Sequence, residues 1–245
     1  MRILIGIDDT DNLESRGTGH RARQLGRGLS DAGLATCLGI TRHQLLVDPA
    51  IPYTSHNSSA CLLVEADDGQ QTALLDWCRD FLLTESAPGS DAGLCLLPAV
   101  SVVAEIQAFG VRAKIEVLTQ AEALRLGQTH AVELHGLTGT GGGVIGALAA
   151  VGLRAGGDDG RFLWLPGLRE LEGVHTVDAL GSLAGIAAVE TIAGALVDGA
   201  DRIDVGPWAR PLLKGGRPVL LVEEADHVAS DWRTAPKDLV KRRSE

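Results

Sequence analysis

The chain has 245 residues and a mass of 25.6 kDa, with 45% hydrophobic and 22% charged residues, so a disordered chain is excluded and one large or two small domains are expected. Aromatic residues make up only 3%, and the core must therefore be built from Leu, Val, Ile and Ala. The net charge of −10 argues against broad binding to nucleic acids or anionic membranes, because a sequence-independent phosphate footprint needs clustered Lys and Arg.

The cysteines and the N-terminus give expectations about the compartment. The N-terminus lacks the charged and apolar regions of a signal peptide, and no apolar run reaches the roughly 18 residues of a spanning helix. We therefore expect a cytoplasmic protein without a membrane partner. The four cysteines are well separated and form no zinc-binding pattern, so we expect reduced core residues at Cys37, Cys61, Cys78 and Cys95.

The first elements predict a strand, a polar loop and a helix. Residues 2–7 are an apolar run that ends abruptly in acidic residues, which is typical of a buried strand that meets a loop. Residues 20–32 carry apolar side chains at helical spacing and stop at Gly33, a residue that commonly ends helices.

Alternating strands and helices follow, which predicts an α/β (α+β) fold. Further strands are expected at 35–41, 60–65, 94–97, 131–134, 161–165 and 218–222. Helices are expected at 70–83, 100–109, 120–126, 144–152 and, in an Ala- and Gly-rich stretch, near 182–197. Residues 231–245 carry many basic side chains without an apolar face, and we expect a flexible tail there.

Three carboxylates, Asp8, Asp9 and Asp11, crowd at the end of the first strand. Like charges repel one another, and hard divalent cations such as Mg²⁺ are the usual means of neutralising them. The pattern predicts that these three aspartates hold Mg²⁺ and act in catalysis. The alternative is a solvated acidic turn that caps a helix.

Two glycine-rich segments each precede a helix, at residues 17–19 and 139–146. Backbone N–H groups without a neighbouring Cβ can approach a phosphate at a helix N-terminus, and together with an acidic cluster they favour a nucleoside triphosphate, ATP, with Mg²⁺. The alternatives are a flexible loop and a close helix contact. The residues predicted to bind the nucleotide are Thr10, Gly17, Thr18, Gly19, Gly141, Gly142 and Gly143.

A dense polar stretch at residues 53–59 lies between a proline turn and a strand, a position that suits capture of a small-molecule substrate. The alternative is an ordinary surface loop. Substrate contacts are predicted for Ser55, His56, Asn57 and Ser58. Other polar candidates, with structural roles equally open, are His20, His175 and Asp178.

Three motifs in this order resemble the archaeal tRNA-isoleucine agmatidine synthetases. They are Gly6-Ile7-Asp8-Asp9-Thr10-Asp11, Pro49-Ala50-Ile51-Pro52-Tyr53 and Gly143-Val144-Ile145-Gly146-Ala147-Leu148-Ala149-Ala150. The resemblance covers residues 1 to about 155 and, more faintly, residues to about 225. It implies a kinase-like nucleotide-binding domain from 1–60 and 130–230, joined to a ferredoxin-like domain at 61–129.

The resemblance also implies a chemistry. In the family, ATP and Mg²⁺ are held by the acidic motif and the glycine-rich segment, a carbonyl oxygen is activated by phosphorylation, and an amine, agmatine, displaces it. Phosphoryl transfer depends mainly on positioning and charge neutralisation, which agrees with the residues found here. We therefore expect an ATP- and Mg²⁺-dependent enzyme that activates a carbonyl or carboxylate oxygen of a small molecule, with an amine as the second reactant.

The chain also departs from the family. The family has an oligonucleotide-binding barrel and a zinc ribbon that hold tRNA, which we do not expect here, and its phosphate-accepting Thr has no counterpart in register after Gly17. Two family cations after the proline turn are replaced by Thr54 and His56. We therefore do not expect the isolated chain to bind tRNA. A non-catalytic nucleotide-binding regulator, and tRNA modification with a separate RNA-binding partner, stay open as alternatives, and a homo-oligomer is allowed.

Overall fold

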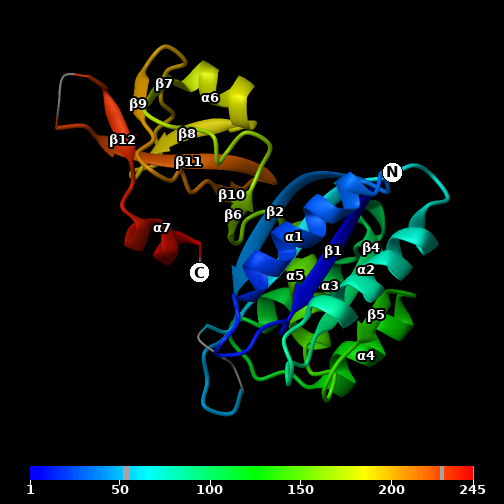
Figure 1. Cartoon of the computed structure of the whole chain (residues 1–245). Coiled ribbons are helices and arrows are strands. Elements are labelled where there is room, and N and C mark those ends of the chain that lie inside the picture. The colour runs from blue at the N-terminus through cyan, green and yellow to red at the C-terminus, as the bar shows by residue number, and fades with distance from the viewer. Residues whose placement is uncertain (52–55, 227–228, 245) are drawn as a thin grey trace. The chain divides into compact units, whose positions relative to one another are not determined.

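The computed structural model describes residues 1–51, 56–226 and 229–244 (Figure 1). Its contacts divide the chain into two compact units, Met1–Gly156 and Gly157–Glu245. The predicted division, with 61–129 as a separate domain, differs from this one, because strands from both predicted domains pair within one sheet of the first unit.

The first unit is built on an antiparallel sheet in the order β5-β4-β1-β3-β2. Its central strand β1 is buried along most of its length and is paired on both sides, so the position of its carboxyl end is fixed by two neighbours. The strands are β1 (Arg2–Asp8), β2 (Thr36–Gln44), β3 (Ser58–Glu65), β4 (Gly93–Pro98) and β5 (Glu133–Gly136).

Helices cover both faces of this sheet (Figure 1). One face is packed by α1 and α2, and the other by α5, against which α3 and α4 lie. The helices are α1 (Thr18–Asp31), α2 (Gln71–Glu85), α3 (Ala104–Arg112), α4 (Gln120–Thr129) and α5 (Val144–Gly156), with a short 3₁₀ turn at Ala99–Ser101.

Glycines allow α5 to lie unusually close to its neighbours. A Cβ at Gly6 of β1 would overlap the carbonyl oxygen of Ala147, and one at Gly152 would overlap the carbonyl oxygen of Ile106 in α3. At the N-terminal end of the helix, a Cβ at Gly143 would lie 2.6 Å from the backbone nitrogen of Gly93. The glycine-rich segment is therefore pressed against the ends of β1 and β4.

The second unit is mostly strands. In it β8 pairs in parallel with β11, and β10 turns into β11 through Gly215 and Gly216, both with positive φ, as a tight hairpin requires. The elements are β6 (Arg161–Trp164), β7 (Val174–Thr176), α6 (Val177–Ala184), β8 (Ala188–Thr191), β9 (Arg202–Asp204), β10 (Leu212–Lys214), β11 (Arg217–Glu224), β12 (Trp232–Thr234) and α7 (Lys237–Arg243).

Two expectations for this unit are wrong. The helix expected near 182–197 is α6, which ends earlier at the left-handed residue Gly185, and residues after it form β8. The expected flexible tail at 231–245 contains β12 and α7, because Val240 is only 2% exposed and packs with Leu212 and Leu221.

The mixture of helices and strands confirms the predicted α+β class. Among the described residues, no helix is both long and apolar enough to cross a bilayer.

Candidate functional site

The chain turns sharply after β1. Asp9 has φ 49°, a left-handed conformation that Asp tolerates better than most residues. Beyond it, Thr10 is 1% exposed and donates from its backbone nitrogen and hydroxyl to the hydroxyl oxygen of Thr18, at 3.3 and 3.2 Å. Thr18 in turn donates to Asp11 Oδ1 from its backbone nitrogen (3.1 Å) and from its hydroxyl (2.8 Å). We call residues 8–11 the acidic loop.

On one side of the acidic loop lies a cavity of about 150 Å³, which we call the acidic cavity. Asp8, Asp9 and Asp91 line it together with Gly142 and Gly143. These side chains come from the end of β1, from the residues before β4 and from the start of α5. The cavity therefore lies where the glycine-rich segment meets the carboxyl end of the central strand.

The carboxyl groups in this cavity are hard to ionise. Burial raises the pKa of Asp8 to about 8, and the negative charges of Asp9 and Asp11 contribute to the rise. Burial also raises the pKa of Asp9, to about 6, with added repulsion from Asp91 and Asp11. Crowded carboxyls of this kind are relieved by a proton or by a bound cation.

Asp91 also belongs to this cluster, although no sequence pattern predicted it. It lies two residues before β4, and β4 is antiparallel to β1 with Gly93 opposite Asp8. The start of an antiparallel neighbour lies beside the end of the central strand, so this pairing would have located Asp91. The sequence predicted strand 94–97 but gave no pairing for it.

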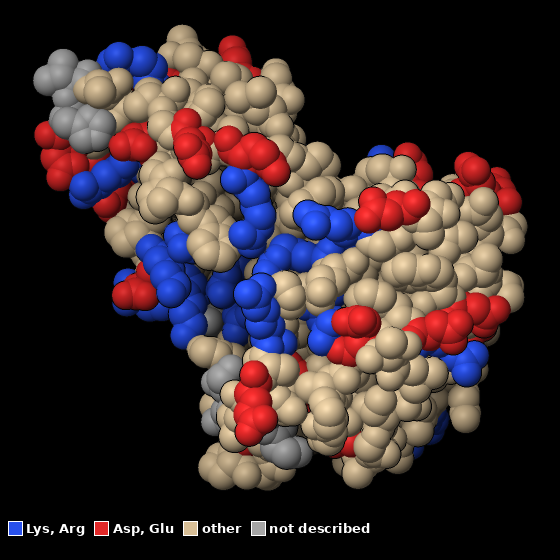
Figure 2. Space-filling view, in the orientation of Figure 1, with Lys and Arg blue, Asp and Glu red and all other residues tan. Residues whose placement is uncertain are grey.

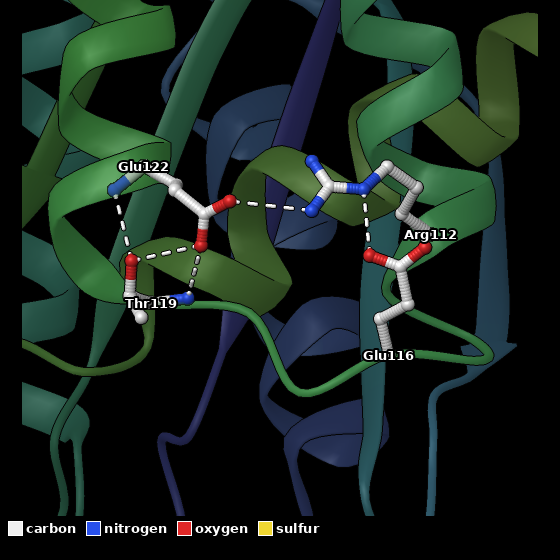
Figure 3. A network of polar contacts seen from close by, with 4 residues as sticks. All are labelled: Arg112, Glu116, Thr119 and Glu122. Atoms are coloured by element: carbon white, nitrogen blue, oxygen red, sulfur yellow. Dashed lines mark hydrogen bonds and ion pairs between the residues drawn. The ribbon is translucent and has the colours of Figure 1, made fainter.

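Glu116, a fourth acidic residue at the acidic cavity, differs because its charge is paired (Figure 3). The Arg112 Nε atom donates to Glu116 Oε2 at 2.8 Å, and Arg112 Nη2 donates to Glu122 Oε1 at 3.2 Å. Glu122 also accepts from the backbone and the hydroxyl of Thr119, and so completes a capping box at the start of α4. The network ties Glu116 to the start of α4 and so fixes this wall of the cavity.

The glycine-rich segment is only in part an open cradle of amides. The Gly141 backbone nitrogen donates to the Thr138 carbonyl (3.0 Å) and that of Gly143 donates to the Asp91 carbonyl (2.9 Å), so these two N–H groups are committed. Gly142 is different, since an added Cβ there would meet only the Thr140 hydroxyl, at 3.6 Å.

On the other side of the acidic loop is a larger cavity of about 410 Å³, which we call the arginine cavity. Arg16, Arg23 and Arg42 line it, and so does the start of α1 at residues 17–19. α1 has no acidic residue in its first turn and its N-cap Gly17 offers no side chain, but Asp11 Oδ1 accepts from the first backbone nitrogen of the helix, that of Thr18. On the face drawn in Figure 2, Lys and Arg gather where α1 and β2 lie in Figure 1.

The predicted site residues are thus divided between two cavities. The acidic cavity contains Asp8, Asp9, Asn57, Gly142 and Gly143, and the arginine cavity contains Asp11, Gly17, Thr18, Gly19, His20, His56 and Ser58. Thr10 and Gly141 line neither cavity, and Ser55 lies outside the described residues. The second unit contains His175, which contacts the Glu172 carbonyl, and Asp178 of α6.

The three predicted metal ligands do not converge. In the described part of the chain, no three His, Cys, Asp or Glu side chains are grouped closely enough to hold a metal ion. Asp11 is held apart from Asp8 and Asp9, because its carboxylate accepts hydrogen bonds from Thr18 and lines the arginine cavity.

Comparison with known proteins supports the resemblance read from the sequence. No protein-family model matches the chain. An uncharacterized protein of Methanocaldococcus jannaschii is 28% identical over 152 residues, which are 62% of this chain and 50% of that protein.

Solved structures of the tRNA agmatidine synthetase TiaS are similar over 62% of the chain. The apo enzyme matches with 27% identity and a TM-score of 0.53 over 35% of its own length. Its complex with tRNA and ATP matches with 27% identity and a TM-score of 0.54, and its complex with tRNA, AMPCPP and agmatine with 27% and 0.53, each over 36% of that chain. The predicted resemblance is therefore confirmed, and the matched part is about a third of the synthetase.

Proposed function

We propose, from the premise that this chain is similar to the tRNA agmatidine synthetase TiaS over 62% of its length, that it is an ATP-using enzyme. One observation carries the proposal. The acidic loop contributes Asp8 and Asp9 to a small acidic cavity and Asp11 to a larger arginine cavity. A cation in the acidic cavity and an anionic group in the arginine cavity can therefore lie on the two sides of the same loop. Such an arrangement would keep a metal-bound nucleotide close to its reactant.

The residues present fit Mg²⁺. Asp8, Asp9 and Asp91 offer hard oxygen donors, and their crowded carboxyl groups are the kind that a divalent cation relieves. Mg²⁺ commonly uses one or two carboxylates and completes its shell with water and phosphate oxygens, so three converging ligands are not needed. When bound, the ion would neutralise charge on the phosphates.

The backbone also fits a phosphate at the acidic cavity. Gly142 precedes α5 and has no side chain that would keep a ligand away from the backbone. We propose that the nucleotide phosphates contact Gly142, with Gly143 holding the segment in place. We also propose that the hydroxyls of Thr10 and Thr18, which were predicted to bind the nucleotide, hold Asp11 in place and close the loop.

The proposed reaction has two steps. A carbonyl or carboxylate oxygen of the substrate attacks the terminal phosphorus of ATP, so an O–P bond forms and the bond to the bridging oxygen breaks, with ADP as the leaving group. The nitrogen of an amine then attacks the activated carbon, phosphate leaves with the C–O electron pair, and the amine loses a proton. The chain's part is to hold the reactants in line and to balance charge.

The test is a screen for ATP consumption against pooled metabolites and amines, with products identified by mass spectrometry. The expected result is ATP consumption that needs both a substrate and Mg²⁺. A chain that binds ATP but consumes none in any pool would instead support the non-catalytic regulator.

A binding experiment tests the metal assignment separately. Asp9→Asn keeps a residue type that tolerates the left-handed conformation, so the loop should keep its shape. Calorimetry with Mg²⁺ and AMPCPP should show that the variant loses most of the Mg²⁺-dependent affinity. Asp80→Asn, at an exposed position of α2, is the matched control. Equal affinity in both variants would contradict the assignment.

A further inference from the structure

The arginine cavity is lined by positive charges that have no role in the proposed metal site. Among the described residues that line it, Arg16, Arg23 and Arg42 stand against one carboxylate, Asp11. That carboxylate accepts two hydrogen bonds from Thr18 at the start of α1. The lining therefore has an excess of positive charge, in a chain whose net charge is −10.

Two histidines, His20 and His56, add to this lining. Burial lowers the pKa of His20, and the guanidinium groups of Arg16, Arg23 and Arg21 lower it further. A proton is thus disfavoured at His20 because positive charge already surrounds it. The same field favours an anion.

The side chains come from three separate segments, which makes the cavity a built feature of the fold. Arg16 precedes α1, Arg23 lies about one and a half turns into that helix, and Arg42 comes from β2, where its Nη2 atom donates to Gln44 Oε1 at 2.9 Å. Residues 17–19 at the start of α1 also line the cavity, where the Thr18 backbone nitrogen donates to Asp11 and that of His20 donates to the Gly17 carbonyl. Guanidinium groups bind phosphate well, because their N–H groups match its oxygen atoms in pairs.

We propose that the arginine cavity binds a phosphate group through Arg23 and Arg42, beside the start of α1. A volume of about 410 Å³ has room for more than the phosphate itself, so the ligand is a phosphorylated small molecule or the phosphate chain of a nucleotide. The proposal rests on the proposed function for the source of the phosphate, ATP or a second substrate, and not for the binding itself.

Calorimetric titration of the full chain with pyrophosphate, in metal-free buffer of about 100 mM salt, tests the binding. The combined variant Arg23→Gln, Arg42→Gln should weaken the affinity by about tenfold or more, since two charge-assisted contacts are lost. Arg27→Gln removes the same charge from an exposed position of α1 outside the cavity and should change the affinity less than about twofold. Thermal melts check that each variant is folded, and the two single variants replace the combined one if it is not.

Unchanged affinity in the cavity variants, or no binding of pyrophosphate by the wild-type chain, would overturn the proposal. The source is then read from competition with saturating AMPCPP and Mg²⁺. Loss of pyrophosphate binding identifies the cavity as the phosphate site of ATP, and retained binding assigns it to a phosphorylated second substrate. Pyrophosphate binding in a chain that consumes no ATP would reject the proposed function and leave the phosphate site standing.

Discussion

Asp8 is a carboxyl group that the fold keeps largely from water, beside two others. The pKa of its carboxyl group is 3.8 when the group is exposed to water, as in the unfolded chain, and about 8 in the folded chain. The folded state therefore binds the proton more tightly than the unfolded state. The free energy of unfolding contributed by this group is present below about pH 4 and is lost as the pH rises toward 8.

Asp8→Asn removes this pH dependence, because the amide cannot ionise. In buffer with a chelator at pH 8, the variant should melt at least about 2 °C above the wild-type chain, and the difference should shrink toward pH 4. Added Mg²⁺ should stabilise only the wild-type chain. Melts recorded at several pH values make the comparison, and a constant difference at every pH would mean that Asp8 ionises normally.

Gly142 can be tested without disturbing the fold, because an added Cβ finds room there. Gly142→Ala should melt within about 1 °C of the wild-type chain but lose much of the rise in melting temperature caused by AMPCPP and Mg²⁺. Gly143→Ala is the contrasting variant, since its Cβ would lie 2.5 Å from the Asp91 carbonyl oxygen and should lower the melting temperature by itself. A full ligand-induced rise in Gly142→Ala would move the nucleotide phosphates to the arginine cavity.

Single acidic residues of the candidate site could be predicted from the sequence, but their grouping in space could not. Asp8 and Asp9 could be found because an apolar run ended at them, and that pattern is local. Asp91 could not, since its place depends on which strand pairs with β1. The separation of Asp11 from the other two aspartates depends on hydrogen bonds from Thr18, and spacing along the chain does not encode them.

Among the elements, α5 positions the acidic cavity. Residues 144–152 were predicted as a helix from their small and apolar side chains, and the helix continues to Gly156. Near 182–197 the same composition predicts a helix that the structure does not have. There α6 ends at Gly185, and the residues that follow form β8, which pairs with β11. Small residues thus allow close packing in either a helix or a strand, and the element packed or paired against them decides which of the two forms.

The close contact of α5 with α3 gives a prediction for stability. Gly152→Ala places a Cβ on the Ile106 carbonyl oxygen, which is backbone and cannot swing away, so the variant should lose about 1–3 kcal/mol of unfolding free energy. Gly156→Ala in the same helix meets nothing within 4 Å and should leave the stability unchanged or slightly raised. Urea unfolding of both variants measures the difference, and equal midpoints would show that α5 can shift away from α3.

For the whole molecule, charge governs what kind of partner can be held. With 32 acidic and 22 basic residues, the chain should not bind tRNA with sub-micromolar affinity in about 150 mM salt, because a long phosphate backbone meets repulsion beyond any local basic site. Gel-shift titrations at two salt concentrations test this. Tight binding that weakens steeply with salt would reveal a continuous basic footprint and favour tRNA modification.

The acidic loop is a partition with one face toward each cavity, since Asp8 and Asp9 line one and Asp11 lines the other. Thr10 follows Asp9 in the chain and hydrogen-bonds to Thr18, which in turn donates to Asp11, so one hydrogen-bonded loop carries both faces. If occupancy on one side changes the affinity on the other, thermodynamic reciprocity requires the factor to be the same in both directions. In that case a cation that draws Asp8 and Asp9 toward it would change the affinity for an anion that it never touches.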